Sequence, residues 1–158
     1  MAVANRARMD RRGFCINACQ IASLVAIGAI FENCGGSPTS PSGSAPALTK
    51  VNGSVAGGAV TVTVDASSPL ASVGGAALVQ SSPGSFLVAR VGQDTFNAMT
   101  ATCTHEACTI DGFTSSVFQC PCHGSQFSTS GSVVRGPAGQ SLRRFNTTFA
   151  ANVLAIAL

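Results

Sequence analysis

The motif Cys103-Thr-His105-Glu-Ala-Cys108 is followed, after a spacer, by Cys120-Pro-Cys122-His123-Gly-Ser125. The 158-residue chain has only two histidines, and both fall in these motifs, two or three residues behind a cysteine. Thiolate and imidazole are the side chains that hold zinc and iron–sulfur clusters, and two ligands on one short loop can close on a metal without a helix between them. The pattern therefore predicts a metal site built from two loops.

Two kinds of metal site fit these residues. A Cys2His2 zinc site would use four ligands and would leave Cys108 and Cys122 without a function. In a Rieske 2Fe-2S centre two cysteines hold one iron and two histidines hold the other. Such a centre would use the set Cys103, His105, Cys120 and His123. The two sites differ in chemistry, because a structural zinc module has no redox role.

The paired motifs resemble the two boxes of Rieske proteins from the cytochrome bc and bf complexes. The similarity continues past the second box through Gln126-Phe127 to Gly131-Ser-Val-Val-Arg-Gly136-Pro137-Ala138, where the family has a proline loop that covers the cluster. The resemblance implies that Cys103 and Cys120 hold a buried iron and that His105 and His123 hold an outer iron. It further implies a disulfide between Cys108 and Cys122, a pair that Rieske ferredoxins and ring-hydroxylating oxygenases generally lack.

Residues around the predicted cluster are expected to set its reduction potential. Ser125 matches a family serine whose hydroxyl donates to a bridging sulfide and raises the potential. Phe127 stands where quinol-oxidising members have a tyrosine that donates to a cysteine sulfur, so we expect a lower potential than in those relatives. Gly136 and Pro137 belong to the covering loop.

The first box departs from the family pattern at two positions. The family usually has a leucine and a glycine after the histidine, and this chain has Glu106 and Ala107. The leucine helps to cover the cluster and to dock on cytochrome b. The carboxylate therefore weakens the case for a standard quinol-oxidising subunit.

The resemblance implies one-electron transfer, and three functions are considered. The first is the iron–sulfur subunit, or a stand-alone relative, of a bc-like quinol oxidoreductase, with cytochrome b and quinol on one side and a cytochrome c-like acceptor on the other. The second is the electron-relay small subunit of another exported oxidoreductase, of the arsenite-oxidase type. The third is the structural zinc module. Whether the chain counts as an enzyme is left open, because one electron carrier without a second site completes no reaction alone.

Residues 1–33 have the pattern of a targeting segment. Paired arginines at Arg11 and Arg12 precede an apolar run from Ile16 to Phe31, which fits a twin-arginine signal as well as an ordinary secretory one. We expect export to a bacterial periplasm or to the outer face of the cytoplasmic membrane, since the twin-arginine route carries folded proteins with their clusters. The run is short for a permanent anchor, so cleavage, retention as a membrane tether and lipidation at Cys34 all stay open.

The rest of the chain divides into a linker, residues 34–49, and one domain, residues 50–158. The linker is rich in Gly, Ser and Pro, which gives a spacer of partial stiffness, either passive or allowing the head to swing. Beyond Cys34 there are five basic and four acidic residues. This near-neutral balance excludes a nucleic-acid-binding domain, which needs a basic face.

Period-two patterns predict an all-β domain. Val60, Val62 and Val64 alternate with polar residues and should face inward. Further strands are expected at residues 85–91, 95–100, 117–118, 133–134, 144–149 and 153–157, the last two forming a hairpin around Ala151-Asn152. No window after residue 50 has a helical period. Together with the resemblance, this predicts an antiparallel β-sandwich of Rieske type with a small cluster-binding subdomain.

Overall fold

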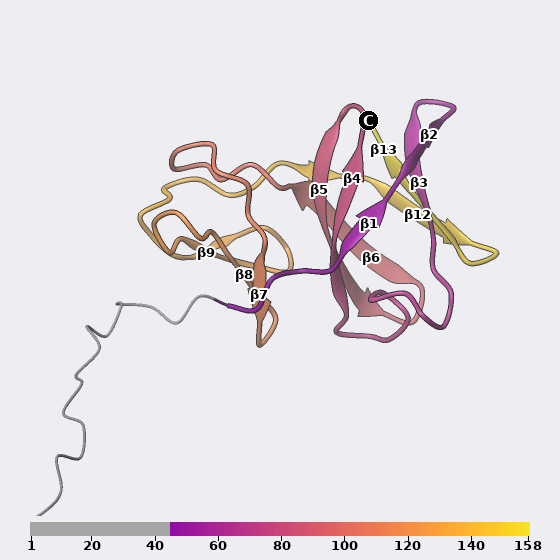
Figure 1. Ribbon diagram of the computed structural model, residues 1–158, viewed down its shortest axis with the longest axis horizontal. Coiled ribbons are helices and arrows are strands. Elements are labelled where there is room, and N and C mark those ends of the chain that lie inside the picture. The colour runs from indigo at the N-terminus through magenta and orange to yellow at the C-terminus, as the bar shows by residue number, and fades with distance from the viewer. Residues whose placement is uncertain (1–44) are drawn as a thin grey trace, which may run out of the picture. The chain divides into compact units, whose positions relative to one another are not determined.

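The computed structural model describes residues 45–158, which form three β-sheets and contain no helix (Figure 1). The predictions for the targeting segment, the lipidation site and most of the linker lie outside these residues. The strands are β1 (Lys50–Asn52), β2 (Ser54–Ala56), β3 (Ala59–Thr63), β4 (Ala76–Ser81), β5 (Gly84–Gly92), β6 (Thr95–Thr100), β7 (Gly112–Thr114), β8 (Val117–Gln119), β9 (Gln126–Ser128), β10 (Val133–Arg135), β11 (Arg144–Phe145), β12 (Thr147–Ala150) and β13 (Val153–Ala157).

The three sheets have distinct places in the fold. The central sheet has the order β1-β4-β5-β6-β11, the outer sheet the order β12-β13-β3-β2, and the small sheet the order β10-β9-β8-β7. The small sheet is inserted between β6 and β11 in the sequence and lies to one side of the other two, as Figure 1 shows. It carries the two cysteine–histidine loops and is the predicted cluster-binding subdomain.

The central sheet is buried on both faces. On one face, Leu78, Leu87 and Met99 form a row across three paired strands and pack with the cysteine loops. On the other face, residues such as Val79 and Val88 pack against the outer sheet. Because successive side chains of a strand point to opposite faces, β4 and β5 each contain four consecutive buried residues. This double burial makes the central sheet the support on which the small sheet rests.

The strand predictions can be compared directly with these elements. The inward faces of Val60, Val62 and Val64 are confirmed, since the three side chains are at most 5% exposed. The predicted strand 144–149 is interrupted at Asn146: β11 pairs with β6 in the central sheet, whereas β12 pairs with β13 in the outer sheet. The chain crosses between sheets there, which a continuous alternating pattern does not reveal.

A strap formed by residues 45–49 joins the small sheet to the central sheet. The Phe113 N–H donates to the Pro46 carbonyl and the Leu48 N–H donates to the Asp111 carbonyl, so the strap runs along β7. A Cβ atom at Gly112 would approach the Ala45 Cβ to 3.1 Å, so the close contact depends on glycine. The strap then continues into β1, which pairs with β4. These residues precede position 50, the predicted start of the domain.

The described residues include no helix of the length and apolar character that crossing a membrane requires.

Candidate metal centre

The two cysteine–histidine motifs fold into loops with the same backbone pattern. In the first loop, the Cys103 N–H donates to the Cys108 carbonyl and the Ala107 N–H donates back to the Cys103 carbonyl. In the second loop, the Cys120 N–H donates to the Ser125 carbonyl and the Gly124 N–H donates back to the Cys120 carbonyl. Each loop thus closes a tight turn that begins at the buried cysteine and presents the histidine on its outer part.

Both turns need a left-handed residue at the same position. Gly124 has φ 72° and Ala107 has φ 54°. Glycine adopts this conformation at no steric cost, whereas alanine is strained in it. The departure from glycine at Ala107 therefore leaves the loop shape intact but stores a small amount of backbone strain.

The two cysteines that begin the loops lie side by side in the apolar core. Cys103 is 3% and Cys120 is 1% exposed, and both thiols are free of disulfides. Burial raises the pKa of the Cys120 thiol, while the backbone N–H groups of Cys122 and His123 lower it and the adjacent Cys103 sulfur raises it. Burial thus favours the protonated form of the Cys120 thiol, whose proton a bound metal cation would replace.

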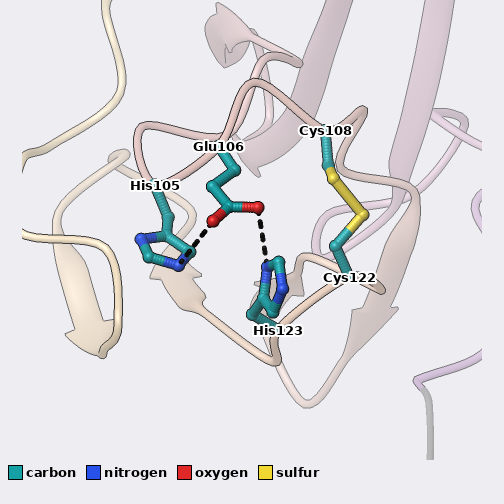
Figure 2. Close-up of a disulfide and its surroundings, with 5 residues drawn as sticks. All are labelled: His105, Glu106, Cys108, Cys122 and His123. Atoms are coloured by element: carbon teal, nitrogen blue, oxygen red, sulfur yellow. Dashed lines mark ion pairs between the residues drawn. A yellow bond between two sulfur atoms is a disulfide. The ribbon is translucent and has the colours of Figure 1, made fainter.

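The two histidines lie at the surface above this pair, with their rings perpendicular and their centroids 5.0 Å apart. The His105 and His123 side chains are 32% and 46% exposed. Figure 2 shows the Glu106 carboxylate between the two rings. One carboxylate oxygen lies 3.8 Å from His105 Nε2 and the other lies 3.7 Å from His123 Nδ1. The outer part of the site thus combines two imidazoles with one negative charge.

Cys108 and Cys122 form a disulfide that joins the two loops, with their Cα atoms 6.5 Å apart (Figure 2). The pairing implied by the resemblance is therefore confirmed. Both sulfur atoms of the disulfide lie within 4.8 Å of the Cys120 sulfur. The bond fixes the second loop to the first close to the buried thiols, and it removes these two cysteines from the possible metal ligands.

The remaining predicted residues line the site. Ser125 is fully buried, and its hydroxyl oxygen accepts a hydrogen bond from the Ala138 N–H at 3.0 Å. This bond holds the segment that contains Gly136 and Pro137 against the second loop and leaves the Ser125 O–H free to donate inward. Phe127 is fully buried in the same apolar cluster as Cys103 and Cys120.

The donor set fits a cluster with one thiolate-bound and one imidazole-bound iron. Two thiols lie beneath the surface and two imidazoles lie above them, on loops that the disulfide holds together. A zinc module would explain the four ligands but not the disulfide beside them. The arrangement matches the division of ligands in a Rieske centre.

Two supporting contacts are not evident from the motifs. The Thr104 hydroxyl donates to the Gln140 carbonyl at 2.6 Å and ties the first loop to the covering segment. Gln119 is buried, and its side-chain oxygen accepts a hydrogen bond from the Ala45 N–H at 3.3 Å. In each contact the two partners are far apart in the sequence, so neither contact could be predicted from the motifs. The one hint in the sequence was the position of Gln119, a polar residue directly before a candidate ligand cysteine.

Comparison with known proteins agrees with this geometry. A family model described as "Rieske [2Fe-2S] domain" matches residues 60–146. The cytochrome b6-f complex iron–sulfur subunit of Synechococcus sp. (strain JA-2-3B'a(2-13)) is 43% identical over 51 residues, which are 32% of this chain and 30% of that subunit. The corresponding subunit of Prochlorococcus marinus (strain MIT 9301) is 44% identical over 61 residues, 38% of this chain and 34% of that subunit. The matches thus span about a third of the length of these relatives.

A solved structure of a Rieske protein has a similar fold. The cyanobacterial plasma membrane Rieske protein from Synechocystis PCC 6803 superimposes with a TM-score of 0.52 and 28% sequence identity, covering 61% of this chain and 99% of that one. Naphthalene 1,2-dioxygenase, at 14% identity and a TM-score of 0.51 over 61% of this chain and 25% of its own, shares the fold alone.

Proposed function

The chain belongs to the Rieske [2Fe-2S] domain family, and we propose that it transfers single electrons through a cluster held by Cys103, His105, Cys120 and His123. The observation that carries the proposal is the layered donor set: buried free thiols, exposed imidazoles above them, and a disulfide that excludes the other two cysteines. A Rieske cluster accepts and releases one electron at potentials between about −150 and +300 mV.

The exposed side of the site is the route for electrons. His105 and His123 are the only predicted ligands with solvent-exposed side chains, so a partner reaches the cluster through their ring edges. The thiols and the apolar core behind them exclude water from the inner side. Each imidazole would offer one ring nitrogen to the cluster and would leave the other to a partner or to solvent.

Three features of the chain act on the reduction potential. The free O–H of Ser125 and the backbone N–H groups near the Cys120 sulfur stabilise added negative charge and raise the potential. Phe127 offers no hydrogen bond where the tyrosine of the resembling proteins offers one. We therefore expect a potential below that of the relatives that have the tyrosine.

The physiological setting proposed for the chain follows its relatives. It acts as the iron–sulfur subunit or a stand-alone relative of a bc-like quinol oxidoreductase, exchanging electrons with membrane and water-soluble redox partners on the outer face of the cytoplasmic membrane. The similarity to cytochrome b6-f iron–sulfur subunits and to a plasma membrane Rieske protein supports this setting. Residues 1–33 serve as the export signal or tether and residues 34–44 as the linker, since residues 45–49 form the strap.

EPR spectroscopy of the dithionite-reduced full chain tests the cofactor. We expect a rhombic signal typical of a histidine-ligated 2Fe-2S cluster, and we expect it to disappear in the His105→Ala and His123→Ala variants. The exposed variant Ser130→Ala is the control and should keep the signal. A colourless protein that binds zinc and gives no signal would overturn the proposed function.

The pH dependence of the midpoint potential tests the role of the exposed imidazoles. If reduction of the cluster is coupled to proton uptake, the potential should fall as the pH rises from neutral to alkaline. A potential that stays flat over this range would argue against proton-coupled transfer at His105 or His123.

A further inference from the structure

Glu106 occupies the surface through which electrons are proposed to pass. Its side chain is 60% exposed. One of its carboxylate oxygens lies within 4 Å of a His105 ring nitrogen, and the other lies within 4 Å of a His123 ring nitrogen. Figure 2 shows that the carboxylate lies between the imidazoles and not beside the disulfide. A partner that touches either ring edge therefore also meets this negative charge.

The charge of Glu106 has no basic partner within the described residues. Its only ion-pair contacts are the two imidazoles. Three of the arginines are engaged elsewhere: Arg90 with the carbonyls of the loop before β4, Arg143 on the Phe145 ring and Arg144 with Asn97. The exposed residues next to the histidines in the two loops, Ala107 and Pro121, are uncharged, and the fourth arginine of the described residues, Arg135, ends β10 before the covering segment.

An uncompensated carboxylate selects between two kinds of partner. Enclosing it in an apolar, water-free pocket removes its hydration without replacing it, which is strongly unfavourable. A hydrated partner surface that presents a lysine or arginine compensates the charge and also speeds the encounter. Of the two settings in the proposed function, the ligand end of this protein is therefore better suited to that of a stand-alone relative, which meets a polar protein surface, than to that of a subunit that enters a buried lipid-quinol pocket.

We propose that Glu106 is a docking residue that directs electron transfer to a water-soluble one-electron carrier with a basic surface. This inference rests on the proposed function, since it concerns the partner of the same site. One electron leaves the reduced protein at the histidine ring edges and passes to the carrier, whose charge becomes one unit more negative. The carboxylate takes no part in the transfer itself and serves only to hold the basic face in place.

Two small one-electron oxidants of opposite charge provide the test: the tris(phenanthroline)cobalt(III) cation, reduced to cobalt(II), and the ferricyanide anion, reduced to ferrocyanide. Stopped-flow rates are measured at low ionic strength with the reduced full chain, its Glu106→Gln and Glu106→Lys variants, and Asp94→Asn. Asp94 lies in the exposed β5–β6 turn of the central sheet, so its variant removes the same charge away from the site.

We expect Glu106→Gln to slow oxidation by the cobalt complex severalfold and to speed oxidation by ferricyanide, and Glu106→Lys to enlarge both changes. If the two oxidation rates change in opposite directions, a change in the reduction potential of the protein cannot be the cause, because it would raise or lower both rates together. Added salt should reduce the differences, and Asp94→Asn should match the original protein.

Two failures can be told apart. Rates that change in parallel or not at all in the Glu106 variants, with a normal Rieske EPR signal, would overturn the docking role alone. A protein without that signal that reduces neither oxidant would overturn the proposed function as well.

Discussion

At the scale of single residues, replacement of Phe127 should change the reduction potential. It is fully buried in the apolar cluster that contains both ligand cysteines. In Phe127→Tyr, a hydroxyl that donates to a cysteine sulfur would stabilise the reduced state. We expect the midpoint potential to rise by roughly 50 mV, since a tenfold shift in equilibrium corresponds to about 59 mV for one electron.

Redox titration of the intact cluster measures this effect. Phe113→Tyr is the matched control, because Phe113 is a partly buried ring that packs on Phe118 in the same sheet. An unchanged potential in Phe127→Tyr, with the cluster fully loaded, would show that residue 127 is not the position of the missing donor.

At the scale of the element, the first ligand loop should gain stability from a glycine. Ala107 has φ 54° where the second loop has Gly124. Ala107→Gly removes a left-handed strain of about 1–2 kcal/mol but adds about 0.5–1 kcal/mol of chain entropy. We expect the free energy of unfolding to rise by up to about 1 kcal/mol.

Denaturant unfolding of the original protein and of the Ala107→Gly variant measures whether the free energy of unfolding rises. Ala155→Gly, in the regular strand β13, serves as the comparison and should lower stability by about 0.5–1 kcal/mol. If Ala107→Gly destabilises the protein as much as Ala155→Gly does, the loop is not strained at Ala107.

The strap is a second element with a measurable contribution. Leu48 is 7% exposed and packs in the cluster that includes Cys103 and Cys120. Leu48→Ala leaves a cavity there, and buried leucine truncations cost about 2–5 kcal/mol. The loss of stability should be accompanied by faster bleaching of the cluster. Leu158→Ala, at a half-exposed site, is the control, and equal effects of the two changes would mean that the strap does not support the site.

At the scale of the whole molecule, the disulfide and the cluster constrain the same two loops. A cross-link closing about 15 residues contributes about 3 kcal/mol in a free chain, and Cys108 and Cys122 are 14 positions apart. With the cluster bound, the double variant Cys108→Ser/Cys122→Ser should lose less than this. The free energies of unfolding of the original protein and of the double variant are measured with and without the cluster. If the double variant loses the same stability in both cases, the disulfide and the cluster do not constrain the same loops.

Sequence alone was informative where a feature depends on neighbouring residues. The spacing of Cys103, His105, Cys120 and His123 gave the candidate ligands, and the resemblance supplied the Cys108–Cys122 pair that the structure contains. The alternation at Val60, Val62 and Val64 located a buried strand face. These patterns arise from loop geometry and from the two-residue period of a strand.

Features that depend on distant partners could not be predicted in the same way. Strand β4 was missed because both of its faces are buried, which replaces alternation by a continuous apolar run. The crossing between sheets at Asn146 depends on strands β6 and β13, and the contact of Ala45 depends on Gln119. The position of Glu106 between the two rings required both loops to be placed.

The strap also has a consequence for the order of folding during synthesis. Ala45 and its partner Gln119 are 74 positions apart, and ribosomes deliver the amino-terminal residue first. Residues 45–48 therefore lack their hydrogen-bond partners in the small sheet until β7 and β8 have been made, and contacts of such long range slow the folding of β proteins. A segment that is synthesised early is thus fixed late, at the stage when both ligand cysteines have become available to receive iron.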